Sequence, residues 1–204
     1  MAKHPHLLLL PFLALAVGLT AVAAGCSSAS GAQDSGGAFD YTLPGGWKDE
    51  SDRAAEVGPE FGLQPAAVRS IAAMDSASPF TVVFVVITPP GLGDLNLDQF
   101  AHATVREVQR ASTARASAVA GGTPPTAVPG PSSPGRLTRT EVAGVPAMQF
   151  DYESASSSGN SGRVRNIAVV HDGTPYLLRF VSVTPNFDTD IEDLEEILES
   201  WQWN

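Results

Sequence analysis

The sequence predicts an α+β fold, a helix–sheet–helix sandwich. Thr81 to Thr88 (TVVFVVIT) is a continuous, largely β-branched run, as expected of a central strand covered on both faces. One helical pattern begins near Asn96, before the later strand patterns, and a second closes the chain. Helices at both ends of a series of strands can cover both faces of one sheet, and this arrangement is the predicted sandwich.

Residues 1–25 are predicted to be a signal peptide. Lys3 gives a weakly cationic start, Leu7 to Leu19 is apolar, and small residues follow, which is the layout of a secretory signal. The apolar run is about 13 residues long, whereas a helix that spans a bilayer needs roughly 20. We therefore expect a cleaved segment rather than a transmembrane helix.

Cys26 is the predicted lipidation site. Val22-Ala-Ala-Gly-Cys26 resembles a lipobox, although Ala23 stands where Leu is usual. A cut after Ala23 is the alternative, and it would leave Cys26 as a free thiol. Because Cys26 is the only cysteine, it has no disulfide partner within the chain. We expect a lipid on Cys26 that anchors the protein to the extracytoplasmic face of the cell membrane.

Residues 26–38 are predicted to be a flexible tether between the lipid and one folded domain. Ser27 to Ala38 (SSASGAQDSGGA) is small, polar and rich in Gly and Ser, so it can bury little apolar area. The single domain is expected to run from Phe39 to Asn204 and to be monomeric.

The first half of this domain contains strand patterns and one helix start. Phe39 to Leu43 alternates with period two and ends at a Pro-Gly-Gly turn. Val68 to Met74 is a weaker strand pattern. Asn96 is a predicted helix N-cap, with Gln99 three residues later as its capping-box partner.

The second half begins with a Pro- and Gly-rich segment, Ala120 to Gly135, which we interpret as a loop inside one domain rather than a boundary. The strand patterns that follow are Leu137–Val142, Ala147–Tyr152, Arg163–His171 and Tyr176–Thr184. Asp172-Gly173 is a hairpin signal between the last two. In the closing helix an apolar stripe runs from Ile191 to Trp201, and acidic residues cover the remainder.

Motifs along the domain resemble the PsbP-like fold. They are Tyr41-Thr-Leu-Pro-Gly-Gly-Trp47, Val145 to Tyr152 (VPAMQFDY), Tyr176 to Phe180 (YLLRF) and Ile197 to Trp203 (ILESWQW). Within this fold the chain is similar to the LpqN-type lipoproteins of actinobacteria, from Phe39 to Asn204. The resemblance implies an antiparallel sheet between helices and surface exposure on a lipid anchor, and it transfers no catalytic residue. Other members of the fold, the photosystem extrinsic subunits and the Ran-binding Mog proteins, act by docking onto partners.

Charge and motif content favour binding over catalysis. A net charge of −10 without a basic stripe argues against nucleic acid as a partner. After cleavage the histidines are His102 and His171, and no nucleophile elbow accompanies them. Two isolated histidines without further cysteines argue against zinc. We expect no metal, no cofactor and no enzymatic activity.

Four side chains are candidates for ligand or partner contacts. Arg163 and Arg165 share one face of their strand, and Arg179 lies on the next strand. All three are candidates to meet the last helix, which has seven acidic residues and no basic one from Asp188 onward. Solvated or paired surface charge is the alternative. Trp47 is the fourth candidate, with core or rim packing as its alternative.

The leading hypothesis is a non-enzymatic docking module that binds a protein or a cell-envelope component. The alternative is a carrier of a small molecule or lipid, in a pocket between sheet and helix. A hydrolase is a third hypothesis, which requires His102 or His171 to lie beside a serine and a carboxylate.

Overall fold

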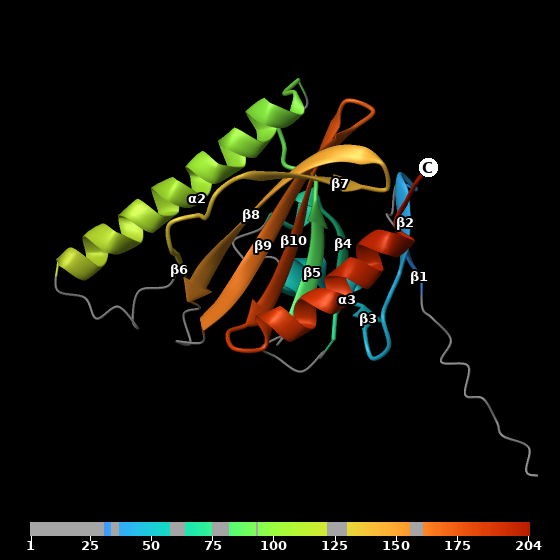
Figure 1. Cartoon of the computed structure of the whole chain (residues 1–204), viewed down its shortest axis with the longest axis horizontal. Helices are drawn as coiled ribbons and strands as arrows, with labels where there is room; N and C mark the ends of the chain where they lie inside the picture. The colour runs from blue at the N-terminus through green and yellow to red at the C-terminus, as the bar shows by residue number, and fades with distance from the viewer. Residues whose placement is uncertain are drawn as a thin grey trace, which may run out of the picture.

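The computed structural model describes residues 31–33, 37–57, 64–74, 82–92, 94–121, 130–155 and 161–204. It confirms the predicted α+β class. An antiparallel sheet lies between two helices, α2 (Leu97–Ala120) and α3 (Phe187–Ser200), which cover its opposite faces (Figure 1). The predicted signal peptide and Cys26 lie outside the described residues, as does most of the predicted tether.

The main sheet has the strand order β3-β4-β5-β10-β9-β8-β6, and β7 pairs with β8 at one end. The strands are β3 (Lys48–Asp49), β4 (Val68–Ala73), β5 (Val82–Ile87), β6 (Gly130–Pro131), β7 (Thr138–Val142), β8 (Val145–Ala155), β9 (Ser161–His171) and β10 (Thr174–Val183). The strands predicted from Val68 onward are therefore confirmed. Asp172 and Gly173 have φ angles of 47° and 76°, as the predicted two-residue hairpin requires.

A second, small sheet consists of β1 (Gly31–Gln33), β2 (Phe39–Thr42) and β11 (Gln202–Trp203). The sequence placed Gly31–Gln33 in the flexible tether, but these residues pair with β2, and Ala32 is buried in the core. Strand pairing uses main-chain groups and needs few apolar side chains, so a small, polar composition did not reveal it.

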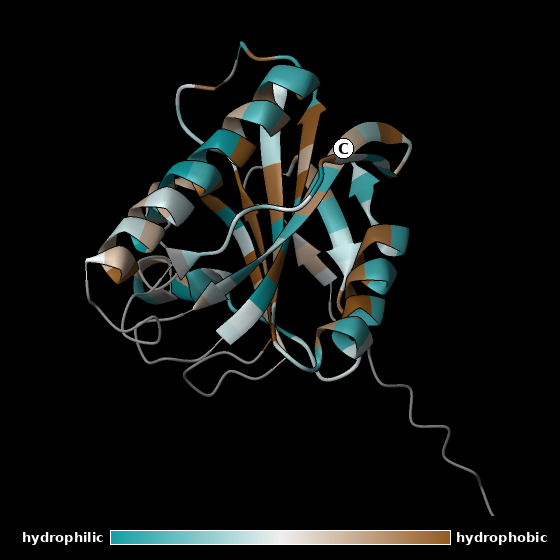
Figure 2. Cartoon of the chain, turned by 60° about the vertical axis from the view of Figure 1, so that its left-hand side comes forward, coloured by the Kyte–Doolittle hydropathy of each residue, from teal (hydrophilic) through white to brown (hydrophobic). Residues whose placement is uncertain are grey.

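Alternate residues of β5 supply two separate cores, because neighbouring side chains of a strand point to opposite faces. Phe84 and Val86 pack in the core that α3 covers, and Val83 and Val85 pack in the core that α2 covers. Figure 2 shows the apolar parts of the strands enclosed between the two helices. The prediction of a central strand covered on both faces is therefore confirmed.

The capping box predicted for α2 is present. Asn96 Oδ1 accepts a hydrogen bond from the Gln99 amide at 3.0 Å, and Gln99 Oε1 accepts one from the Asn96 amide at 3.1 Å. The buried residues of α2 are Phe100, Ala101, Thr104 and Val108. All of them lie in its first half, so its last turns extend beyond the main core (Figure 1).

Polar contacts fix α3 against the sheet and the segment before β3. Ser182 donates a hydrogen bond to Asp190, and Trp47 Nε1 donates one to Asp193 at 3.0 Å. Phe187, Leu194 and Ile197 are buried on its inner side. Short helices at Ser51–Arg53, Ala54–Val57 (α1) and Pro65–Ala67 complete the described elements.

Candidate functional site

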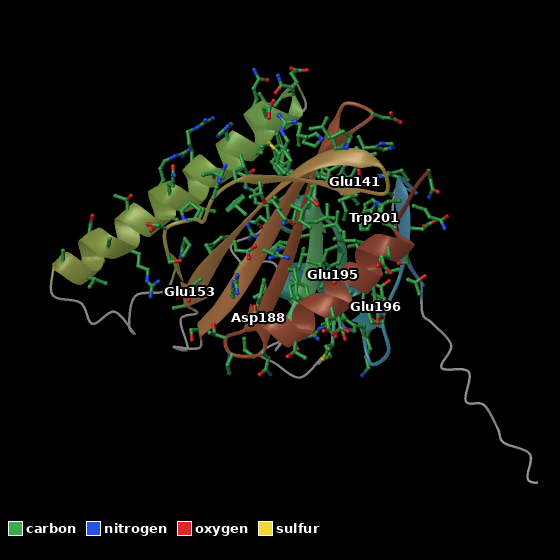
Figure 3. All side chains as sticks on the ribbon, viewed as in Figure 1. Glu141, Glu153, Asp188, Glu195, Glu196 and Trp201 are labelled. Carbon is green, nitrogen blue, oxygen red and sulfur yellow. The ribbon has the colours of Figure 1, made fainter. Side chains whose placement is uncertain are left out.

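Arg163 and Arg165 of β9 share the carboxylate of Asp151 on β8. Arg165 donates through Nε at 2.8 Å and through Nη2 at 2.9 Å, and Arg163 donates through Nη2 at 3.0 Å. Arg163 also donates to Asp188 in the first turn of α3, at 3.1 Å. Arg163 thus contacts the acidic helix, one of the two possibilities that the sequence left open. Figure 3 shows Asp188, Glu195 and Glu196 following one another along that helix.

Neighbouring carboxylates neutralise the positive charges of Arg163 and Arg165. The hydrogen bonds from Arg165 to Asp151 raise the pKa of the Arg165 guanidinium. The Arg163 guanidinium lies 4.5 Å from the centroid of the Phe187 ring, which adds a cation–π contact. The cluster joins β8, β9 and α3, so its charges serve as paired structural groups, the alternative that the sequence left open.

Arg179 does not join the other two arginines. In the β9–β10 register Arg179 lies opposite Asn166, whereas Phe180 lies opposite Arg165. Paired residues share a face, so Arg179 points to the opposite side of the sheet from Arg165. There its Nε donates to Asn166 Oδ1 at 3.1 Å. The expectation that all three arginines meet the acidic helix is wrong for Arg179.

Trp47 belongs to the core. Its side chain is 5% exposed, its ring lies 6.3 Å from the ring of Phe180, and its Nε1 is occupied by Asp193. The amide of Trp47 donates to the Pro44 carbonyl at 3.1 Å, which closes the predicted turn. Core packing, the alternative weighed for this residue, accounts for its position.

The two histidines lie apart. His102 is exposed on α2, and His171 at the end of β9 stacks on Trp203 with ring centroids 4.4 Å apart. Within the described residues neither histidine forms a hydrogen bond with a serine, so the arrangement required for a hydrolase is not formed there. That part of the chain also contains no group of three His, Cys, Asp or Glu residues placed to hold a metal ion.

A surface pocket of about 390 Å³ lies at the ends of β4 and β5 and beside the β9–β10 hairpin. Three segments line it: Gln64, Ala66, Ala67 and Arg69 around the start of β4, 88–91 after β5, and 173–175 in the hairpin. Among the described residues, the lining has one charged side chain, Arg69, and no His, Cys, Asp or Glu. The described lining is therefore a concave surface that carries one positive charge, on Arg69.

A β-bulge positions Arg69. Val68 pairs with Ile87 and Ser70 pairs with Val86, so Arg69 is an extra residue without a partner on β5. Bulges often redirect a side chain next to a functional site. Arg69 Nε donates to Thr88 Oγ1 at 3.1 Å, which ties the guanidinium to the segment after β5. Thr88 is itself held by a 2.8 Å hydrogen bond from its amide to the Ala67 carbonyl.

Sequence reasoning did not single out Arg69. It did predict the Asp172-Gly173 hairpin on one side of the pocket, whereas the Pro89-Pro-Gly91 turn after β5 was not singled out. The fold brings these turns together because β10 pairs with β5. An arginine at the start of a weak strand pattern was the available signal, but a bulge leaves no clear mark in one sequence.

A second depression of about 380 Å³ lies where α2 extends beyond the core. Its lining includes Ser112, Ala116 and Val119 of α2, with Pro131 and Ser132 at β6. Nearer the start of α2, Phe100 and Ala101 fill the space against the sheet. The carrier hypothesis placed its pocket between sheet and helix, and this depression lies at the margin of that interface.

The fold is the PsbP-like α+β fold. No family model matches the chain, and no curated protein sequence matches it. Among solved structures it is similar to cyanobacterial PsbP (CyanoP) from Synechocystis, with a TM-score of 0.53, 13% identity, and coverage of 89% of this chain and 96% of that one. It is also similar to LpqN from Mycobacterium tuberculosis, a protein involved in cell envelope biogenesis, with a TM-score of 0.48, 16% identity, and coverage of 87% and 86%. At such identities the likeness shows the fold alone.

The described residues contain no helix that is both long and apolar enough to cross a membrane.

Proposed function

We propose that this chain is a lipoprotein of the LpqN type, anchored through Cys26 on the extracytoplasmic face of the cell membrane. In this proposal its domain is a non-enzymatic docking module for a protein or a cell-envelope component. The observation that carries the docking role is the pocket at the ends of β4 and β5. Its described lining presents the Arg69 guanidinium and no His, Cys, Asp or Glu, so these residues are equipped to bind rather than to transfer protons.

The arrangement of the other polar groups supports the same role. Asp151 is occupied by two arginines, Asp190 by Ser182, and Asp193 by Trp47. Each of these pairs joins one element to another. Catalytic groups instead converge on a point where a reacting atom can sit, and these contacts are spread over β8, β9, β10 and α3.

The anchor part of the proposal rests on the lipobox-like sequence that ends at Cys26. A lipid there would keep the domain at the membrane surface and so raise its effective concentration near envelope components. One acyl chain binds a membrane only marginally, whereas two or more hold a protein stably. A diacylglyceryl group meets that requirement.

Metabolic labelling of cells with an alkyne fatty acid tests the anchor. We expect the wild-type chain to be labelled and the Cys26→Ser chain to be unlabelled and released from the membrane fraction. An unlabelled wild-type chain would contradict the proposal. Asp34→Ser in the tether region provides a matched variant that is expected to keep the label.

Site-specific photo-crosslinking in cells tests the docking role. We expect a photoreactive residue at Pro90, on the rim of the pocket, to give one cross-linked product of defined mass. A broad mixture of products is not expected. A photoreactive residue at Glu196 on the outer side of α3 probes the opposite possibility, that the acidic helix carries the contact. Failure to obtain a discrete product at either position, beside a measured turnover by the purified chain, would sink the docking proposal.

A further inference from the structure

We infer that the pocket at the ends of β4 and β5 binds a small organic anion, and that Arg69 holds its carboxylate or phosphate group. This inference rests on the proposed docking function and names the chemical class of ligand that its pocket takes. It depends on three features: the orientation of Arg69, the lack of a competing carboxylate among the described residues, and the composition of the remaining described lining.

The orientation of Arg69 leaves two donor nitrogens for a ligand. Its Nε is engaged by Thr88 Oγ1 at 3.1 Å. The bond to Thr88 restricts the guanidinium, and Nη1 and Nη2 remain at its far end. These two nitrogens form the planar fork that matches the two oxygens of a carboxylate or two oxygens of a phosphate. A guanidinium restrained in this way loses less conformational entropy when it binds.

No carboxylate of the described residues compensates Arg69. Arg163 and Arg165 each form an ion pair with Asp151, and Arg53 forms ion pairs with Glu50 and Glu56. In the described part of the chain Arg69 forms no ion pair, and none of the residues that line the pocket is acidic. In a protein with a net charge of −10, a half-buried arginine that has no acidic partner among the described residues is available to an external anion.

The remaining lining suits an organic group rather than a bare ion. Pro89 and Pro90 after β5 and Pro175 in the hairpin offer rigid apolar surfaces, and Ala66 and Ala67 add to them. A volume of about 390 Å³ lies within the usual range for small-molecule pockets and leaves space beyond a single charged group. The expected ligand therefore combines one anionic group with an apolar part.

Ligand-observed NMR titrations of the purified full chain in detergent test the inference. The probes are benzoate, phenyl phosphate and neutral benzyl alcohol, which share a ring and differ in the charged group. We expect at least one of the two anions to bind, and the alcohol to bind about tenfold more weakly or less, since hydrogen bonds to charged groups contribute the difference. Comparison of the two anions shows whether a carboxylate or a phosphate is preferred.

Variants assign the binding to Arg69. We expect Arg69→Gln to weaken binding of the preferred anion about tenfold or more, and Arg136→Gln, an equal charge change at an exposed arginine, to leave it within about twofold. Arg69→Lys keeps the charge but lacks the fork, and Thr88→Val frees Nε, so each should weaken binding by a smaller factor. Circular dichroism checks folding. If Arg69→Gln fails to fold, Arg69→Lys and Thr88→Val decide whether Arg69 binds the anion.

Equal binding of the alcohol and the anions would overturn the inference, as would equal losses in Arg69→Gln and Arg136→Gln. Absence of binding by both anions would also overturn it. If a discrete cross-linked product from Pro90 or Glu196 persists in that case, the docking proposal stands and only the assignment of an anionic ligand fails.

Discussion

Asp151 stabilises the β8–β9 region through two ion pairs, because its one carboxylate binds the guanidinium groups of both Arg163 and Arg165. The side chains of Asp151 and Arg165 are each 22% exposed, so water compensates them only in part. Asp188 also forms an ion pair with Arg163, but the side chain of Asp188 is 90% exposed. Two aspartates at similar distances from one arginine therefore differ mainly in burial, which makes them a matched pair for experiment.

Asp151→Asn should lower the free energy of unfolding by about 1–3 kcal/mol, because it leaves the half-buried Arg165 without its anionic partner. Asp188→Asn should change it by about 0.5 kcal/mol or less, as is usual for an exposed ion pair. Urea denaturation of both variants, followed by circular dichroism, measures the difference. Similar losses in the two variants would show that burial does not control the strength of this cluster.

The opposite orientation of Arg179 shows what a hairpin register can predict. A two-residue turn at Asp172-Gly173 pairs Arg179 with Asn166, and paired residues lie on the same face. Arg165 is one position from Asn166 and must therefore point the other way. The sequence contained this information, since the turn was predicted. Adjacency of two strands does not by itself place their side chains on one face, because the register decides which residues are paired.

At the scale of elements, α3 combines two kinds of carboxylate. Asp190 and Asp193 accept hydrogen bonds from Ser182 and Trp47, so they bind the helix to the rest of the fold. Glu192 and Glu196 are exposed and lie one turn apart, where like charges repel. The exposed glutamates therefore act against the stability of the helix that the two aspartates fix in place.

Glu196→Gln should raise the free energy of unfolding by about 0.2–0.5 kcal/mol, because it removes one like charge next to Glu192. The gain should shrink in about 1 M salt, where the Debye length falls to about 3 Å. Thermal unfolding at low and high salt measures both values. Asp193→Asn, on the same helix, should instead destabilise the protein, since it weakens the contact with Trp47. A gain from Glu196→Gln that is independent of salt would contradict the electrostatic explanation.

The elements that the sequence predicted are those with a strong local pattern. The capping box at Asn96 and the β-branched run of β5 are specified by adjacent residues, and both are confirmed. The strands β1 and β11 have only three and two residues, and their pairing depends on where β2 lies in the fold. The bulge at Arg69 depends likewise on the register of β4 against β5. Of the candidate site, the bordering hairpin at Asp172-Gly173 was thus predictable.

At the scale of the molecule, one sheet separates two cores. The α3-side core contains Trp47 and Trp201, and Trp203 packs against it. Phe100 of α2 is fully buried in the other core. Since alternate residues of β5 enter both cores, loss of either core should remove support from the same strand. The two sides of the sandwich are therefore expected to unfold as one unit.

Phe100→Ala tests this coupling, because all three tryptophans lie on the side of the sheet away from the substitution. Truncation of a buried phenylalanine should lower the free energy of unfolding by about 3–5 kcal/mol. If the cores are coupled, tryptophan fluorescence and circular dichroism should shift to the same lower urea midpoint. Gln109→Ala, at an exposed position of the same helix, should shift neither signal appreciably. A fluorescence midpoint that stays in place while the circular dichroism midpoint falls would mean that the α2 side unfolds alone, and that the shared sheet does not make the domain cooperative.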